Sequence, residues 1–554
     1  MRTCRTALGR LGRAGRRASA ARPVRGGALL GLGFFLVIAS WSLATPIGST
    51  DEPAHIVKAV ATARLEFHGR LVPISRQRSR FPPQWDLPPA MSEYRVPRGY
   101  RQPLVPCFYD QTQSPACAAR LSSSRKTVWA PTYVGSFNPT YYAIVGWPSL
   151  LLTGDTGVYA MRLCSAAASA LLLGLAGFCL LRSGRGRAGI LALGLGATPM
   201  ALFAGAIVNP SGMEISAAIL AWCAALSLLT ARELSRRDIG VLLGPLALGL
   251  ALLSEVRLLG PLWVAVIVVT ALSVSTRTAR AALRTDRRVW AAAAVVLLAI
   301  GTALWWSLTA PLELFSLQDS FHTFLPAMRM TADTIPIYLQ QMVFLYGWAE
   351  AAAPTLAMIL VFAGLTVLVL PALSVRRYGP VVFLLLVGMV VLPVLVQGYE
   401  MHDRGVQWQG RYQLPYAAGI PLVAAYAVRL PKPSARWTSA AVALIQGCCL
   451  CWTIRRNADL GGLWGSVSHW QTVWAPPGSW LPPIALGAAG MALLAACGAR
   501  DIATGPEPLP PPGAGDGGLA FAAAPDQISV PAQAVVGEKL PASANSGARP
   551  WRRA

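Results

Sequence analysis

Long apolar stretches separated by short polar segments make up most of the first 500 residues. About 12 of these stretches are long enough to cross a hydrocarbon core, which is about 30 Å thick. They lie near residues 27–45, 157–181, 188–207, 212–231, 239–256, 258–275, 289–309, 355–373, 379–397, 412–430, 437–453 and 481–498. The pattern predicts an all-α polytopic membrane protein with about 12 transmembrane helices.

Composition and charge fit this arrangement. Charged residues make up 13% of the 554 residues, whereas a soluble protein has about 25%. In a soluble protein the net charge of +24 would suggest a nucleic-acid partner. Here the arginines gather in short segments between apolar stretches, such as RSGRGR at 182–187 and RTARAALRTDRR at 277–288. This is the positive-inside pattern of cytoplasmic loops, so no nucleic-acid partner is expected.

The charge rule also assigns the other segments of the chain to the two sides of the membrane. Residues 1–26 are basic and are expected in the cytoplasm. The first apolar stretch exceeds the ~7–15 residues of a signal-peptide core, so it is expected to remain as an anchor. Residues 27–499 are the predicted membrane domain, with extracytoplasmic loops at 47–155 and 310–354. The Pro-, Gly- and Ala-rich residues 500–554 are expected to be a disordered cytoplasmic tail.

A shorter apolar segment, NPTYYAIVGWPSLLL at 138–152, is not counted among the crossings. At about 1.5 Å per residue, its helix would be shorter than the hydrocarbon core. If it crossed, the basic segment 182–187 would face outward, against the charge rule. We therefore expect an interfacial helix, with Tyr141 and Tyr142 close to the outer surface of the membrane.

The segment STDEPAHIVKAVATARLEFHG directly follows the first apolar stretch. Ser49 or Thr50 can cap a helix that has Asp51 and Glu52 in its first turn. The apolar stripe of that helix is Ile56, Val57, Val60, Ala63 and Phe67, and its polar stripe is Asp51, His55, Lys58, Thr62 and Glu66. This pattern predicts an amphipathic helix lying on the membrane surface, with Asp51 and His55 one turn apart and facing the same site.

Two carboxylates at this place allow two interpretations. Acids in the first turn of a helix suit its dipole and need have no other role. Alternatively, Asp51 and Glu52 are catalytic, since a carboxylate can take a proton from an attacking hydroxyl group. They are also candidate ligands of a divalent cation bound to phosphate, which the pattern allows but does not require.

Further ionisable and polar residues fall at the outer ends of the predicted helices. Such groups are costly at membrane depth and are usually functional. Arginine suits phosphate because its planar guanidinium binds two oxygens at once. Structural ion pairs with nearby acids are the alternative for each arginine. With His55, Tyr141 and Tyr142, the candidate substrate-binding residues are Arg162, Asn209, Glu214, Glu255, Arg257, His402 and Arg411.

Two of the ten cysteines, Cys107 and Cys117, lie in the long polar loop rather than in an apolar stretch. If that loop is extracytoplasmic, a disulfide between them is one alternative and two unpaired thiols are the other.

The order of these motifs resembles that of a known group of enzymes. TDEPAHIVKAVATARLEFHGRLVP, then NPTYYAIVGW and MRLCSAAASALL, is similar to the start of the GT-C superfamily of membrane glycosyltransferases. The later segments NPSG and GRYQLP are similar to those of a bacterial membrane family of uncharacterised function that has an Asp-Glu-Pro-x-His motif after its first span.

The resemblance implies transfer of a sugar from a polyprenyl-phosphate donor to an extracytoplasmic acceptor: a cell-envelope glycan, a lipid or a protein. It matches Asp51 to the catalytic acid and Glu52 to its neighbour. It also matches Tyr141, Tyr142 and Arg162 to the returning helix and the second span. The alternatives are a transporter or flippase of a lipid-linked sugar, and a catalytically inactive membrane protein. The sequence predicts a cell-membrane protein whose partners are membrane lipid and the donor.

Overall fold

The computed structural model describes residues 2–73, 75, 90–109, 114–310, 324–347, 351–404, 408–431, 434–457 and 474–499. The long apolar helices are α1 (Arg2–Ala44), α4 (Gly154–Arg182), α7 (Pro210–Leu229), α8 (Arg236–Val256), α11 (Arg287–Thr309), α13 (Thr355–Leu373) and α14 (Gly379–Arg404). The remaining helices are α2 (Glu52–Thr62), α3 (Pro139–Gly146), α5 (Gly186–Gly196), α6 (Pro199–Ala206), α9 (Gly260–Ser273), α10 (Arg277–Thr285), α12 (Phe324–Val343), α15 (Gly410–Ala417), α16 (Gly419–Ala427), α17 (Ser434–Asn457) and α18 (Leu481–Ala499). Short 3-10 helices are η3 (Arg98–Tyr100), η4 (Pro115–Cys117) and η5 (Trp147–Leu150). The strands are β1 (Arg70–Pro73), β2 (Ala90–Pro97), β3 (Thr127–Thr132), β4 (Leu345–Tyr346) and β5 (Ala351–Ala352).

Seven helices in the described residues are long and apolar enough to cross a membrane, with Arg22–Ala44 as the apolar part of α1. The pair α5 and α6, bent by 60°, would make an eighth. The 12 predicted crossings are therefore not confirmed. Every predicted stretch does coincide with a helix or a helix pair, but several are short. For example, α9 has 14 residues, and α15 and α16 have 8 and 9.

Small residues allow α1 and α4 to pack closely. Gly27 and Gly31 form a Gly-x-x-x-Gly pair on α1 and face Gly174 of α4. A Cβ atom on Gly174 would lie only 2.9 Å from the Cα of Gly31. Such pairs let helix backbones approach in membranes, where van der Waals packing and hydrogen bonds replace the hydrophobic effect. This contact sets the C-terminal end of α1 against the N-terminal half of α4, where the candidate site lies.

Helix α2 differs from the predicted amphipathic surface helix. All its residues, Glu52–Thr62, are buried, and it packs against β2, β3 and α3. The polar stripe of α2 can be buried because oxygen atoms of the covering residues accept hydrogen bonds from Lys58. The ammonium group of Lys58 donates to the carbonyls of Phe67 and Gly135, each at 2.7 Å, and to the hydroxyl of Tyr94 at 2.9 Å. The prediction of a helix lying on the membrane surface was wrong.

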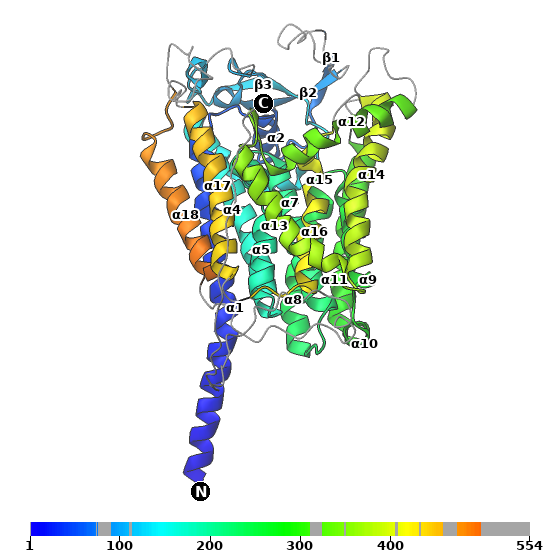
Figure 1. Cartoon of the computed structure of the whole chain (residues 1–554). Helices are drawn as coiled ribbons and strands as arrows, with labels where there is room; N and C mark the ends of the chain where they lie inside the picture. The colour runs from blue at the N-terminus through cyan, green and yellow to red at the C-terminus, as the bar shows by residue number, and fades with distance from the viewer. Residues whose placement is uncertain are drawn as a thin grey trace, which may run out of the picture. The chain divides into compact units, whose positions relative to one another are not determined.

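The covering element is an antiparallel sheet in the order β1-β2-β3, which the all-α prediction lacked. Figure 1 shows these strands and α2 together at one end of the helices. Tyr94 and Val96 alternate with the polar Glu93 and Arg95 along β2, and Ala130 is the partner of Tyr94 on β3. Tyr94, Val96 and Ala130 are buried. This period of two was the sequence signal for β2.

The segment that follows the sheet behaves as a short element. Helix α3 has eight residues, continues into η5, and is not among the helices long enough to cross a membrane. Earlier in the same loop, Cys107 and Cys117 form a disulfide, with their Cα atoms 6.3 Å apart.

Candidate functional site

The turn between α1 and α2 has an unusual backbone. Gly48, Thr50 and Asp51 have φ values of 97°, 24° and 61°. A non-glycine residue in this region costs of order 1–3 kcal/mol, and such residues concentrate at functional sites. Asp51 occupies the N-cap position of α2, but its side chain makes no capping hydrogen bond. The predicted capping of this helix by Ser49 or Thr50 was therefore wrong, and the Asp51 carboxylate is directed to other partners.

Asp51 lies between a tyrosine and an arginine from distant parts of the chain. Tyr133 donates its hydroxyl to Oδ1 of Asp51 at 2.9 Å, and Nη2 of Arg411 donates to Oδ2 at 2.6 Å. The Arg411 side chain is 5% exposed, whereas that of Asp51 is 24% exposed. Asp51 is thus an accessible carboxylate held in place by a buried cation.

Its surroundings keep Asp51 ionised. Burial acts to raise the pKa of this carboxyl group, but the charge of Arg411 and the hydrogen bonds from Arg411 and Tyr133 outweigh that effect, so the pKa is lowered. The pKa of Tyr133 is raised well above its usual value by burial and by the Asp51 charge. At neutral pH, a protonated tyrosine therefore donates to a charged carboxylate.

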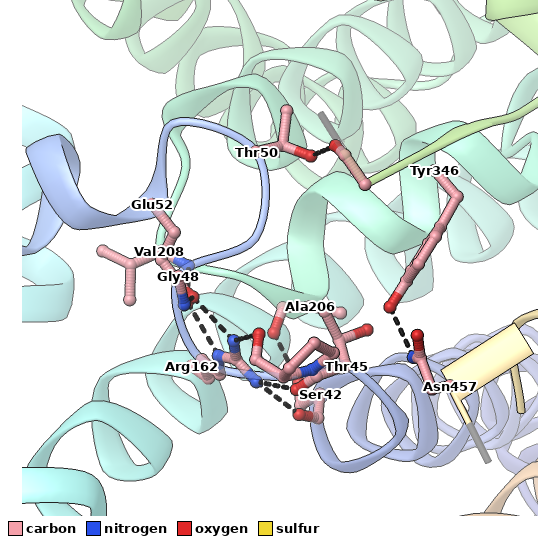
Figure 2. Close-up of polar contacts among 12 residues, drawn as sticks. Ser42, Thr45, Gly48, Thr50, Glu52, Arg162, Ala206, Val208, Tyr346 and Asn457 are labelled. Atoms are coloured by element: carbon pink, nitrogen blue, oxygen red, sulfur yellow. Dashed lines mark hydrogen bonds and ion pairs between the residues drawn. The ribbon is translucent and has the colours of Figure 1, made fainter. Parts of the chain in front are cut away.

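Glu52 has different partners, and Figure 2 shows its side chain directed toward Arg162 among the helices. Its two oxygens accept from Nε and Nη2 of Arg162 at 2.7 and 2.6 Å. They also accept from the backbone N–H groups of Gly48 and Val208 at 3.0 and 3.1 Å. Both side chains are 0% exposed. The catalytic and metal roles predicted for Glu52 are therefore corrected: its carboxylate is a buried structural group.

The remaining N–H donors of Arg162 bind carbonyl groups at the C-terminal end of α1. Nη1 donates to the carbonyls of Ser42 and Thr45, both at 2.7 Å, and Nη2 donates to that of Pro46 at 2.9 Å. Helix C-termini leave carbonyls without partners, and a cation there also suits the helix dipole. The substrate-binding role predicted for Arg162 is replaced by a structural one, since all five N–H donors are used.

A shared metal site at Asp51 and Glu52 does not fit this geometry. Glu52 already accepts four hydrogen bonds, and its partner cation is Arg162. Across the described part of the chain, no three His, Cys, Asp or Glu side chains form a group that could hold a metal ion.

His55 is buried one turn after Asp51, and its Nδ1 lies 2.8 Å from the hydroxyl of Tyr142. Burial lowers the pKa of His55 to about 3, with Asp51 opposing the shift and Arg257 and Arg411 adding to it. The imidazole is thus neutral at pH 7, and it serves as a hydrogen-bonding group rather than as a cation.

This shift predicts acid sensitivity. Between pH 6.5, near the usual pKa of histidine, and about 3, the unfolded chain binds a proton at His55 but the folded chain does not. Stability should therefore fall as the pH drops through this range, with the unfolding constant rising by up to about tenfold per pH unit. In His55→Gln the thermal midpoint should fall less steeply between pH 6.5 and 4. His68→Gln, at an exposed histidine, is the control, and equal slopes for parent and His55→Gln would contradict the assignment.

A second arginine lies beside this group. The guanidinium of Arg257 is 4.3 Å from the ring centre of Tyr412, and its Nη1 donates to the hydroxyl of Ser211 at 2.7 Å. Its Nε is 3.8 Å from Oε2 of Glu214. The Arg257 side chain is 17% exposed, so it is more accessible than Arg411.

Both arginines contact the same aromatic ring, since the guanidinium of Arg411 is 5.3 Å from the ring centre of Tyr412. Within the described residues, Nε of Arg411 and Oε2 of Glu214 are buried without a hydrogen-bond partner. Buried polar atoms without partners are costly, and each calls for an explanation. A ligand with oxygen atoms and a hydroxyl group would satisfy both.

The two tyrosines of α3 are buried beneath this site. Tyr142 contacts His55, as described above, and the hydroxyl of Tyr141 lies 3.1 Å from that of Ser165 on α4. Tyr142 therefore contacts His55, which lies one helical turn from Asp51. Tyr141 instead supports the packing of α3 on α4.

Three other predicted residues lie in different places. Asn209 caps α7 and is buried. Glu255 accepts from Nδ2 of Asn138 at 2.6 Å and from the hydroxyl of Thr302. Asn209 thus begins its own helix, and Glu255 links α8 to α11 and to the start of α3. The side chain of His402 lies outside the described residues.

The structure adds Tyr133, Tyr412 and Ser211 to the site, none of which was predicted. Tyr412 had a signal, because an aromatic residue beside Arg411 is a candidate for a cation–π contact. Tyr133 had none, because its partner Asp51 is 82 positions away.

Comparison with known proteins gives one match. A family model described as a predicted membrane protein, DUF2142, matches residues 34–420. This range contains both Asp51 and Arg411. No curated protein and no solved structure matches the chain.

Proposed function

We propose a sugar-transfer function for this chain, which belongs to the DUF2142 family of membrane proteins. It moves a sugar from a polyprenyl-phosphate donor to an acceptor, on the extracytoplasmic side, as GT-C glycosyltransferases do. The observation that carries the proposal is the pairing of Asp51, a 24% exposed carboxylate, with Arg411, while Arg257 lies against the same tyrosine ring.

The two arginines suit the donor phosphate. Guanidinium groups bind phosphate oxygens through paired hydrogen bonds, and Nε of Arg411 is a buried donor without a partner among the described residues. A phosphate that binds Arg411 competes with Asp51 for the same cation. Donor binding would thereby release the Asp51 carboxylate next to the reacting carbon. Because charge grows on the departing phosphate, the arginines bind the transition state more tightly than the donor.

Asp51 suits the role of general base. In the proposed step, an acceptor oxygen forms a bond to the anomeric carbon, and the bond from that carbon to the phosphate oxygen breaks. The acceptor proton moves to Asp51, and polyprenyl phosphate leaves. The carboxylate charge also stabilises the positive charge that develops on the sugar ring. Nucleotide sugars are not available outside the cell, so a lipid phosphate is the leaving group that fits.

Transport of a lipid-linked sugar is the alternative. Transporters bind substrates near the membrane midplane, where discontinuous helices expose backbone groups. The bend between α5 and α6 is a discontinuity of this kind. However, the backbone carbonyl of Ala197 at this bend already accepts a hydrogen bond from Nε2 of Gln446, at 2.9 Å. The charged site instead adjoins the turn between α1 and α2, which supports an enzyme over a transporter.

The proposal is tested with the purified protein in lipid vesicles and a polyprenyl-phosphate donor with a radiolabelled sugar. Release of polyprenyl phosphate with transfer of the label is expected. Arg257→Gln should raise the donor KM by roughly 10–100-fold, because it removes a hydrogen bond to a charged group. Arg182→Gln, which breaks the partly exposed pair of Arg182 with Asp238 at the opposite end of α4, is the control. Movement of intact donor across the bilayer without release would instead establish a transporter.

A further inference from the structure

Two segments of the first loop form a strip of positive charge. Strands β2 and β3 pair antiparallel up to Pro97 and Thr127. The pairing continues beyond them, because the N–H groups of Arg98 and Gly99 donate to the carbonyls of Lys126 and Ser124, at 2.8 and 3.1 Å. Farther along, the Cys107–Cys117 disulfide joins the same two segments. We call the cations on these segments the basic ribbon: Arg95, Arg98, Arg101, Arg120, Arg125 and Lys126.

The basic ribbon faces outward, and its two described segments contain no acids; Asp110, between them, lies outside the described residues. All six side chains are exposed, and neither 94–109 nor 114–132 contains Asp or Glu. Glu66 and Asp155 contact the ribbon through the backbone N–H groups of Arg95 and Leu121, at 3.2 and 2.9 Å. A dense, exposed set of cations of this kind attracts anions. It is also unexpected on the side of the membrane that the charge rule leaves poor in arginine.

An apolar rim adjoins the ribbon. We define it as Trp147, Leu150 and Leu151, which are 50%, 49% and 65% exposed. These residues directly precede α4, one of the helices long enough to cross a membrane. Exposed tryptophan and leucine at the end of such a helix fit the boundary between head groups and hydrocarbon.

Direct hydrogen bonds hold the rim against the ribbon. Nη2 of Arg125 donates to the carbonyl of Leu151 at 2.8 Å. The hydroxyl of Tyr100 donates to the carbonyl of Leu152 at 2.6 Å, and that of Thr153 donates to the carbonyl of Ser123 at 3.0 Å. The ribbon is therefore fixed at the depth where the rim meets lipid.

We propose that the basic ribbon and the apolar rim together bind the head groups of anionic phospholipids in the adjacent membrane leaflet. The rim places the cations at the level of the lipid phosphates, and neither described segment of the ribbon contains an acid that would compete for them. Each cation near an anionic membrane surface contributes about fivefold to affinity. The depth of the rim favours lipid over a soluble acidic polymer. This site is separate from Asp51, and the proposal does not depend on the sugar-transfer function.

The test uses the whole protein in bilayers of phosphatidylglycerol and phosphatidylcholine at one to three. After gentle extraction, native mass spectrometry counts the lipids that each protein retains. The parent should retain phosphatidylglycerol in preference to phosphatidylcholine. The variant Arg95→Gln/Arg98→Gln/Lys126→Gln should lose at least tenfold of that preference, and Trp147→Gln/Leu151→Gln should reduce it as well. The matched control Arg95→Lys/Arg98→Lys, which preserves charge, should retain most of it.

Thermal midpoints establish that each variant is folded. Equal retention of phosphatidylglycerol by the parent and the triple Gln variant would overturn the proposal, as would a parent without preference between the two lipids. If the triple variant keeps its lipids but loses binding of a soluble polyphosphate, the ribbon is a polymer site and the lipid assignment fails.

Discussion

Replacing Asp51 with Asn should lower the rate of sugar transfer by roughly 10²–10⁴-fold, the range typical of losing a general base. Asn has nearly the same shape: its Oδ1 can accept from Arg411, and the hydroxyl of Tyr133 can rotate to accept from its Nδ2, so the site should keep its geometry. It cannot take a proton from the acceptor. The loss should therefore appear in kcat. The thermal midpoint should also fall, because Arg411 loses its counter-charge, but by less than in Arg162→Met, because Asp51 is 24% exposed.

The measurement is release of polyprenyl phosphate by purified variants in lipid vesicles. Glu66→Gln is the matched control, since it makes the same change at a carboxylate of the same loop that accepts from the N–H of Arg95. It should leave turnover unchanged. Near-normal turnover in Asp51→Asn would show that Asp51 is not the general base. Its ion pair with Arg411 would then have only a structural role.

Much of the helical architecture could be predicted because it depends on local pattern. Apolar length alone located the helices, since a membrane-spanning helix is read from consecutive residues. The number of crossings could not be derived in this way, because α9 and the pair α15 and α16 are apolar but short. Whether such a segment crosses is decided by its neighbours rather than by its own composition.

Helix α2 shows why an amphipathic pattern is not enough. The apolar and polar stripes of α2 fit a helix on the membrane surface. The same pattern also fits a buried helix whose polar side chains find hydrogen-bond partners on another element. Here Tyr94 on β2 and the carbonyl of Gly135 receive the Lys58 ammonium group. The sheet that carries Tyr94 is built from three short strands separated by long loops, so the pattern of α2 itself does not predict it.

The same limit applied to the acids. Asp51 and Glu52 are neighbours in the chain and looked like one catalytic pair. Their partners, Arg411 and Arg162, are 360 and 110 positions away. The left-handed backbone at Asp51 separates the two carboxylates. Residue type identified the site, but only the tertiary contacts separated the accessible acid from the structural one.

Breaking the Glu52–Arg162 pair should have the largest effect on stability. Arg162→Met leaves the Glu52 carboxylate fully buried with only the N–H groups of Gly48 and Val208. Removing one partner of a buried ion pair costs about 3–5 kcal/mol, and here the end of α1 also loses its donors. Arg162→Met should therefore be recovered in low yield, with a thermal midpoint far below that of the parent.

A second variant separates charge burial from simple loss of contacts. In Glu52→Gln/Arg162→Met no unpaired charge remains, so part of the lost stability should return, although the carbonyls of Ser42 and Thr45 still lack a donor. Arg70→Ala, which breaks an ion pair with a 54% exposed arginine, should cost only about 0–1 kcal/mol. Thermal unfolding followed by tryptophan fluorescence in detergent compares the three. If Arg162→Met is as stable as Arg70→Ala, the buried pair does not hold α1, α2 and α4 together, and Glu52 would again be available as a second acid beside Asp51.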